Sequence, residues 1–359
     1  MSGAGRARSE GLELRFHFGE RDRDGDGPLD AAVMDACERA GVWAAALLRG
    51  MEGFGGNARE RTDRLLSLSE DAPLVAVAVG EAARVEALAE EVRAVASEGL
   101  LTLTPTGSAT PSAAVVAEPV GGSPGDVVRA TIWGARSGPR SPHLRAVDAL
   151  YRHGADCATV LLGVDGVLEG ERRRARFVAA NRGVPAMTVA VGERAAIDAA
   201  LAEVGALANL VTIEAVEPLS VIGRLKLHSD EGVERNRPYE AERLHGAAER
   251  GAAAEGARVT LVTSESTGRD AHPLYLEYVH ALRRAGAPGA TALRGVWGFR
   301  GEVAPHGDRV LALRRDVPVI VETVDTAERA ARWLEIAEGL AGSPDVVYSQ
   351  RALRNFPLD

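Results

Sequence analysis

The chain has 359 residues, of which 46% are apolar and 26% charged, a composition typical of a globular protein with more than one domain. Its formal net charge of −9 argues against a general nucleic-acid-binding protein, since such proteins are usually basic. Lys226 is the single lysine, which excludes a P-loop and confines any Schiff-base chemistry to that residue.

The first predicted strand is marked by alternation, because Leu14, Phe16 and Phe18 are separated by Arg15 and His17. This period of two is typical of a half-buried strand. A helix is then expected between Pro28 and Gly41. The next expected elements are strands at 44–48, 74–79 and 100–103, a helix at 82–96, and a helical stretch at 59–68 inside a long loop.

The same βαββαβ order is predicted twice more. The expected strands are 128–133, 157–162, 186–191 and 210–216 in one segment, and 259–264, 290–294, 319–324 and 345–349 in the other. The expected helices are 142–153 and 194–206, then 274–285 and 327–340. This order predicts an α+β fold made of three ferredoxin-like units.

A short glycine motif recurs in phase with these units. It reads LRGMEGFG at 48–55, LLGVDGV at 161–167 and LRGVWGF at 293–299. A glycine precedes the first motif glycine by nine residues each time, and a proline follows at Pro73, Pro185 and Pro318. Repetition at this interval indicates repeated domains. We therefore expect repeat 1 at 12–104, repeat 2 at 128–217 and repeat 3 at 258–352, joined by a flexible linker at 105–127 and a charged linker at 218–257. In the second linker, an edge strand at 221–227 and a short helix at 239–254 are further expectations.

Several of these segments carry a family resemblance. LRGMEGFG at 48–55, DRLLSLSEDAPLV at 63–75, and TSES, HPL and GATALRGVWGF within 263–299 resemble the PII-like family catalogued as domain of unknown function 190. The resemblance covers most of repeats 1 and 3 and is weaker in repeat 2. Such domains resemble PII signalling proteins, which are trimers of ferredoxin-like subunits with small ligands held between subunits.

The resemblance implies a regulatory protein whose three repeats form an intramolecular pseudo-trimer. It suggests no certain cofactor, but an adenine nucleotide or another small anion as effector. The repeats lack the lysines that PII proteins use around phosphates, so arginines would have to replace them. Because the loops at 54–72, 167–184 and 299–317 contain no tyrosine, switching by tyrosine modification is not expected.

Charged residues at strand ends are the first candidates for binding. The first two strands of such a unit run parallel, so Glu20 should lie beside Arg49 and Glu52, and Glu265 beside Arg294. Repeat 2 has Ala135 and Leu162 at the matching positions. Each pair has two possible roles. It is either an ion pair that fixes the loop, or it lines a cleft between domains, where its arginine can bind a phosphate or carboxylate.

The loop glycines and the third loop supply the other candidates. Backbone geometry or the close approach of a ligand would both explain the paired glycines. Trp297 could stack on an aromatic ligand or cap a domain interface. The remaining candidates for ligand binding are Gly50, Gly53, Gly295, Gly298, His306 and Arg309.

No catalytic or metal-binding constellation is evident. Residues 22–27 resemble the start of a calcium loop, but Val33 stands where the bidentate glutamate is required, so no metal site is expected. No Ser-His-Asp order occurs, and the protein is not expected to be an enzyme. Cys37 and Cys157 are predicted to be reduced packing residues, and His17 and His143 ordinary surface or strand residues.

These observations favour a cytoplasmic signalling module that binds a small-molecule effector and acts through its long loops on a protein partner. A membrane transporter is one candidate partner; neither nucleic acid nor membrane insertion is expected. We expect a monomeric pseudo-trimer or a dimer of such rings. The alternatives are a ligand-independent scaffold or transporter regulator and, less favoured, a hydrolase of phosphorylated metabolites.

Overall fold

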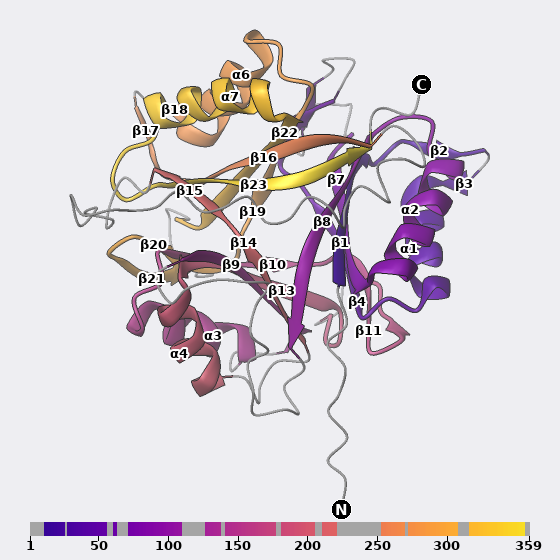
Figure 1. The fold of residues 1–359 in the computed structure, drawn as a ribbon, viewed down its shortest axis with the longest axis horizontal. Coiled ribbons are helices and arrows are strands. Elements are labelled where there is room, and N and C mark those ends of the chain that lie inside the picture. Colours follow the sequence, from indigo (N-terminus) through magenta and orange to yellow (C-terminus); the bar gives the residue numbers. More distant parts are fainter. Residues whose placement is uncertain are drawn as a thin grey trace, which may run out of the picture.

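The computed structural model describes residues 11–25, 27–55, 60–62, 71–109, 126–137, 141–176, 181–204, 210–220, 253–269, 272–307 and 316–355. The chain is a mixed α/β protein with three repeated regions (Figure 1). In each region two helices cover the outer face of a group of strands. The three groups of strands lie toward the centre of the molecule.

Repeat 1 contains two helices, α1 (Leu29–Ala40) and α2 (Ala82–Val95). Gly41 ends α1 in the left-handed conformation, with φ 61°, which a residue without Cβ adopts at little cost. Its strands are β1 (Gly11–Gly19), β2 (Arg23–Asp24), β3 (Gly27–Pro28), β4 (Ala44–Arg49), β5 (Glu52–Phe54), β6 (Glu60–Thr62), β7 (Pro73–Glu81) and β8 (Leu100–Ala109).

Repeats 2 and 3 follow the same order. Repeat 2 consists of β9 (Val127–Ala135), α3 (Pro142–Arg152), β10 (Cys157–Leu162), β11 (Asp165–Leu168), β12 (Glu171–Arg172), β13 (Pro185–Glu193), α4 (Arg194–Val204), β14 (Leu210–Ala215) and β15 (Glu217–Ser220). Repeat 3 consists of β16 (Ala253–Ser264), β17 (Gly268–Arg269), β18 (His272–Pro273), α6 (Leu274–Arg284), β19 (Ala290–Arg294), β20 (Trp297–Arg300), β21 (Val303–Gly307), β22 (Pro318–Thr326), α7 (Ala327–Leu340) and β23 (Val346–Asn355).

Each repeat builds a four-stranded antiparallel sheet with one strand order. The order is β8-β1-β7-β4 in repeat 1, β14-β9-β13-β10 in repeat 2 and β23-β16-β22-β19 in repeat 3. The first and third strands of every repeat are therefore central, and they pair in the same register. Gly19, Ala135 and Ser264 each face the proline that begins the third strand, which makes them equivalent positions. The expectation that Ala135 matches Glu20 and Glu265 is therefore wrong by one residue, and Arg136 holds that position in repeat 2.

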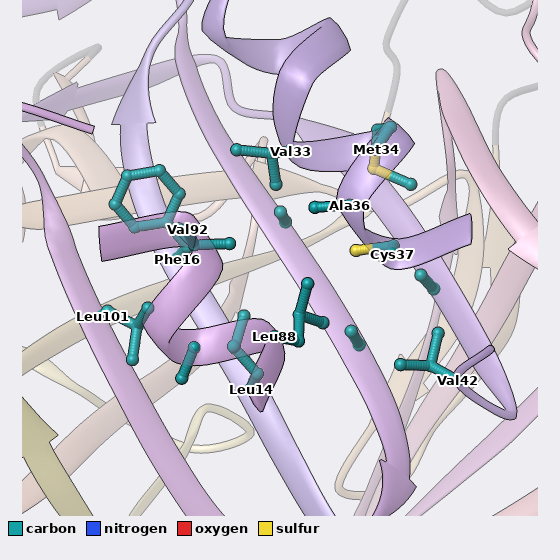
Figure 2. Close-up of a cluster of buried hydrophobic side chains, with 14 of the residues drawn as sticks. Leu14, Phe16, Val33, Met34, Ala36, Cys37, Val42, Leu88, Val92 and Leu101 are labelled. Atoms are coloured by element: carbon teal, nitrogen blue, oxygen red, sulfur yellow. The ribbon is translucent and has the colours of Figure 1, made fainter. Parts of the chain in front are cut away.

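The helices pack on the sheets through apolar cores (Figure 2). In repeat 1, Val33 and Cys37 of α1 and Leu88 of α2 lie against Leu14 and Phe16 of β1. All five side chains are buried, and burying apolar surface of this kind stabilises the fold by about 25 cal/mol per Å². Cys37 and Cys157 are both buried and free, as predicted from the sequence.

The opposite face of each sheet is also covered, which corrects the expectation of a half-buried first strand. Arg15 on that face is 1% exposed, because the sheets of the other repeats lie against it. A second apolar core joins all three repeats there; its members include Val77, Trp133, Val189, Val262, Ile320 and Tyr348. The alternation of polar residues in β1 thus reflects a buried polar layer between repeats.

The sheets are joined to one another by strand extensions. The end of β8 pairs with β14, β15 pairs with β23, and the end of β23 pairs with the start of β8. Repeat 1 is therefore linked to repeat 2, repeat 2 to repeat 3, and repeat 3 back to repeat 1.

Some predicted elements differ from the structure. The helical stretch expected at 59–68 is wrong where it is described, since residues 60–62 form β6. The linkers contain strand at their ends, because β8 runs to Ala109 and β15 begins at Glu217. Residues 253 and 254, expected to end a helix, belong to β16. The strand expected at 221–227 lies outside the described residues.

Candidate ligand site

The recurring glycine motif forms the contact between repeats. After the first motif glycine, each copy continues as a short strand that pairs antiparallel with the second sheet strand of another repeat. We call each of these contacts a seam and number it by the two repeats that it joins. β5 pairs with β19 at the 1–3 seam, β11 with β4 at the 1–2 seam, and β20 with β10 at the 2–3 seam. These short strands were not predicted from the sequence, which indicated only the glycine motif and the start of a long loop at these positions.

The second motif glycine is required by close packing at each seam. A Cβ atom there would meet a carbonyl oxygen of the neighbouring repeat: Gly53 and Ala290 O, 2.6 Å; Gly166 and Ala45 O, 2.3 Å; Gly298 and Ala158 O, 2.1 Å. The recurring spacing to proline in the three repeats has the same origin, because Pro73, Pro185 and Pro318 lie next to these glycines. The motif glycines therefore serve strand packing between repeats.

The expected strand-end ion pairs are present in repeats 1 and 3. Arg49 Nη2 lies 2.9 Å from Glu20 Oε2, and Arg294 Nη2 lies 2.9 Å from Glu265 Oε2. The Arg49 and Glu20 side chains are 32% and 39% exposed, so water screens this pair. An anion that binds either arginine would compete with a carboxylate already in place.

The other predicted residues lie near the seams but do not gather into one site. Glu52 is buried on β5, and Trp297 is half-buried on β20, next to Gly307. His306 Nδ1 donates a hydrogen bond to the carbonyl oxygen of Ala304 at 2.8 Å. Gly50 and Gly295 lie at the start of the 1–3 and 2–3 seams, and Arg309 lies outside the described residues.

A cavity of about 400 Å³ lies at the 1–3 seam. This volume is within the usual range of roughly 300–1,000 Å³ for small-molecule sites. Repeat 1 lines it with β1, β5, β6 and the start of β8, and repeat 3 with β19, β22 and the turn before β19. Phe18, Phe54, Pro73 and Pro288 give it apolar walls, and Gly55 lies at the start of the long loop of repeat 1.

The charges on the cavity wall are mostly negative. Asp22, Glu98 and Glu322 line the cavity together with one guanidinium, that of Arg61. Arg61 is 8% exposed and lies 3.4 Å from Asp22 and 3.3 Å from Asp71, so its charge is shared between two carboxylates. Among the described residues that line the cavity, Arg61 is the only arginine or lysine.

His17 places an imidazole in the wall between the two repeats. Its Nδ1 lies 3.3 Å from Thr291 Oγ1, and its Nε2 is buried without a hydrogen-bond partner in the described part of the chain. Burial lowers the pKa of His17 to about 4, so the ring is neutral at pH 7. A neutral imidazole carries its proton on one of its two nitrogens. If Nδ1 donates to the hydroxyl of Thr291, Nε2 is a hydrogen-bond acceptor; if Nδ1 accepts from that hydroxyl, Nε2 is a donor. The sequence predicted His17 to be an ordinary surface or strand residue. Its place in the cavity wall could not be predicted, because the cavity forms only where repeat 3 packs against repeat 1.

The equivalent places at the other two seams are filled by side chains. At the 2–3 seam, Arg300 occupies the position of Gly55 and donates to Ser264 Oγ at 2.9 Å and Thr267 Oγ1 at 2.7 Å. At the 1–2 seam, Trp133 and Leu168 occupy the positions of His17 and Gly55. Trp133 is fully buried there. The sequences of the repeats have thus diverged so that the 1–3 seam has smaller side chains and an open space. Large side chains fill the equivalent places at the other two seams.

A buried ionic cluster lies next to the cavity, where the three sheets meet. Glu13 of repeat 1 accepts from Arg15 at 2.7 Å, from Arg129 of repeat 2 at 3.2 Å and from Arg258 of repeat 3 at 3.2 Å. Burial alone would raise the pKa of Glu13, but the three guanidinium groups outweigh it and hold the pKa well below its usual value. Glu322 connects the cluster to the cavity, because it lines the cavity and binds Arg15.

Among the described residues, no three His, Cys, Asp or Glu side chains are grouped so that they could hold a metal ion. Within the same part of the chain, no helix combines the length and apolar character needed to cross a membrane.

Three comparisons relate the chain to known proteins. Residues 11–107, 135–218 and 256–351 each match the profile of domain of unknown function 190, described as "Uncharacterized ACR". A "UPF0166 protein" of Aquifex aeolicus (strain VF5) is 29% identical over 79 residues, which cover 22% of this chain and 75% of that protein. The crystal structure of aspartate kinase from Synechocystis aligns with a TM-score of 0.24 and 9% identity over 96% of this chain, and the chain spans 43% of the kinase.

Proposed function

Because the chain belongs to the family of domain of unknown function 190, we propose that it is a PII-like regulatory protein. In this proposal the three repeats are ferredoxin-like units arranged as one intramolecular pseudo-trimer. A small metabolite binds between repeats and changes the conformation of the long loops. The loops then act on a protein partner, for which a membrane transporter is one candidate.

The strand pairing supports the architectural part of the proposal. A four-stranded antiparallel sheet whose first and third strands are central, with two helices on one face, is the ferredoxin-like arrangement. Pairing of every repeat with both others, in one register at all three seams, is the relation expected within a trimer. The cluster around Glu13 fits the same interpretation, since one residue meets an arginine from each repeat.

The observation that carries the functional part is the cavity at the 1–3 seam. Its wall includes Phe54, Gly55 and Arg61, which flank the described ends of the long loop of repeat 1. The opposite wall belongs to repeat 3 and is part of its sheet. A molecule held there would touch both the base of the loop and the neighbouring repeat. If the molecule binds one conformation of the loop more tightly than another, its binding shifts the population toward the first conformation. The size of the shift is set by the difference in binding free energy between the two loop conformations.

Regulation fits this site better than catalysis. The cavity offers a neutral imidazole and carboxylates that are paired or at its mouth, and the described residues around it show no activated nucleophile. A cytoplasmic location is part of the proposal and follows from the expected reduced state of Cys37 and Cys157.

A screen for stabilisation of the folded chain tests the proposal. The protein is heated with a library of metabolites that contains nucleotides, small anions, and neutral and basic heterocycles. A ligand that binds only the folded state raises the melting temperature. The proposal requires at least one hit that also slows amide exchange in β5 and β6. It is wrong if hits leave the exchange of this segment unchanged, or if they are turned over.

Gly55→Leu supplies a matched variant for this screen, because it copies Leu168, the residue that repeat 2 has at this position. No atom lies within 4 Å of a Cβ placed on Gly55, so the backbone tolerates the change. The leucine side chain would extend into the cavity, and the hit should no longer stabilise the protein. Persistence of the shift in Gly55→Leu would place the ligand elsewhere.

A further inference from the structure

The composition of the cavity wall narrows the class of ligand, and this step rests on the proposed function. We infer that the 1–3 cavity binds one planar heteroaromatic amine per chain, neutral or protonated, and excludes anions. The inference departs from the anionic effector that the resemblance implies.

The charge balance supplies the first argument. An anion would enter a space lined by Asp22, Glu98 and Glu322. Glu322 is offset by Arg15, which donates to its two oxygens at 2.8 and 2.7 Å. Asp22 and Asp71 together exceed the single charge of Arg61, and Glu98 adds a further negative charge at the exposed edge. The charges of the described residues in the wall therefore favour an amino or amidine group over a carboxylate or phosphate.

The neutral and aromatic groups of the wall supply the second argument. His17 lines the cavity, and burial lowers its pKa to about 4, so its ring is neutral at pH 7. The imidazole therefore adds no positive charge that could hold an anion. The aromatic rings of Phe18 and Phe54 line the same cavity and suit a flat, weakly polar body.

The filled seams fix the stoichiometry. At the 2–3 seam, Arg300 bonds to Thr267 and lies 3.4 Å from Asp345. These residues are the equivalents of Asp22 and Gly99, which line the cavity at the 1–3 seam. Arg300 therefore occupies the volume that a ligand would take. Trp133 does so at the 1–2 seam, so a single site per chain is expected.

Three probes of one shape test the inference. They are 2-aminobenzimidazole, benzimidazole and benzimidazole-2-carboxylate, each titrated into the full chain by calorimetry at pH 7.5. We expect 2-aminobenzimidazole to bind with one site per chain and the carboxylate to bind at least about tenfold more weakly, which corresponds to about 1.4 kcal/mol. Equal or tighter binding of the carboxylate, two or three sites per chain, or no binding of the amine at millimolar concentration would each overturn the inference.

Two variants keep the test specific to the cavity. Gly55→Leu should abolish binding of the amine. Glu98→Gln changes an exposed residue at the cavity edge, so it should not disturb folding; it should weaken the amine and strengthen the carboxylate by about twofold to fivefold. Unchanged affinities in both variants would place the probe outside the cavity. If the carboxylate binds best and Gly55→Leu abolishes that binding, the proposed function stands and the ligand class is wrong.

Discussion

Arg129 of repeat 2 donates a 3.2 Å hydrogen bond to Glu13 of repeat 1, although the two residues occupy the same position in their repeats. Each lies six residues before the position that faces the proline of the third strand. Three identical subunits would place three like charges at this point. The divergence of the repeats replaces that repulsion by a hydrogen-bonded cluster with Arg258, the third equivalent residue.

Glu13→Arg should therefore be more damaging than Glu13→Gln. The arginine adds a further positive charge to a fully buried group of guanidinium ions, whereas the glutamine only removes the negative one. Leaving buried charges uncompensated costs about 3–5 kcal/mol, so we expect Glu13→Gln to lower the free energy of unfolding by that amount. Urea denaturation measures both variants, with Glu20→Gln at the exposed pair as control and an expected loss of at most ~1 kcal/mol. Equal midpoints for Glu13→Arg and the wild type would refute this explanation of the cluster.

Arg15 and Glu322 should show strong energetic coupling across the 1–3 seam. Their side chains are 1% and 3% exposed and joined by two short hydrogen bonds. Either single variant, Arg15→Met or Glu322→Leu, should cost about 3–5 kcal/mol because it strands a buried charge. The double variant should cost at least ~2 kcal/mol less than the sum of the single variants. A double-mutant cycle on unfolding free energies measures the difference, and strict additivity would contradict a direct contact.

Gly298→Ala tests the packing of the 2–3 seam. Its Cβ would lie 2.1 Å from the carbonyl oxygen of Ala158, so β20 must move away from β10. We expect a loss of roughly 1–3 kcal/mol in the free energy of unfolding. Gly339→Ala in α7 is the matched control, because no atom lies within 4 Å of its Cβ. That variant should gain about 0.5–1 kcal/mol, since glycine is unfavourable inside a helix. A loss in both variants would mean that the seam is not the cause.

Acid should destabilise the protein already below pH 6.5. The prediction of His143 as a surface or strand residue is wrong, because it lies in α3 and is 2% exposed. Burial lowers its pKa to about 4, against an ordinary value near 6.5 in the unfolded chain. Between these values the unfolded state binds the proton and the folded state does not, so stability falls as the pH is lowered. His143 alone should account for about 3 kcal/mol of this loss at pH 4. His143→Gln should reduce the slope of unfolding free energy against pH in this window; an unchanged slope would exclude His143 as a source.

The repeated fold could be predicted because its signals are local. Alternation in β1, the glycine that ends α1 and the apolar stripe of α2 depend only on neighbours in sequence. The strand-end pairs of Arg49 and Arg294 followed from topology in the same way. β5, β11 and β20 could not be recognised, since each is short and its partner lies in another repeat.

The cavity was missed for the same physical reason. His17 and Glu322 belong to different repeats and are far apart in sequence, and only the pairing of β5 with β19 brings both into one wall. Gly55, Leu168 and Arg300 are equivalent because each follows the second motif glycine by two residues. The meaning of this equivalence, an open seam beside two filled ones, required the geometry of the seams.

The mass of the particle in solution tests ring closure within one chain most directly. Size-exclusion chromatography with light scattering, at low micromolar concentration, gives this mass without a calibration of shape. If the three seams are satisfied inside the chain, the particle should have the mass of one chain, 37.7 kDa. A stable particle of three chains would contradict the account, because it would mean that each repeat finds its partners in other molecules.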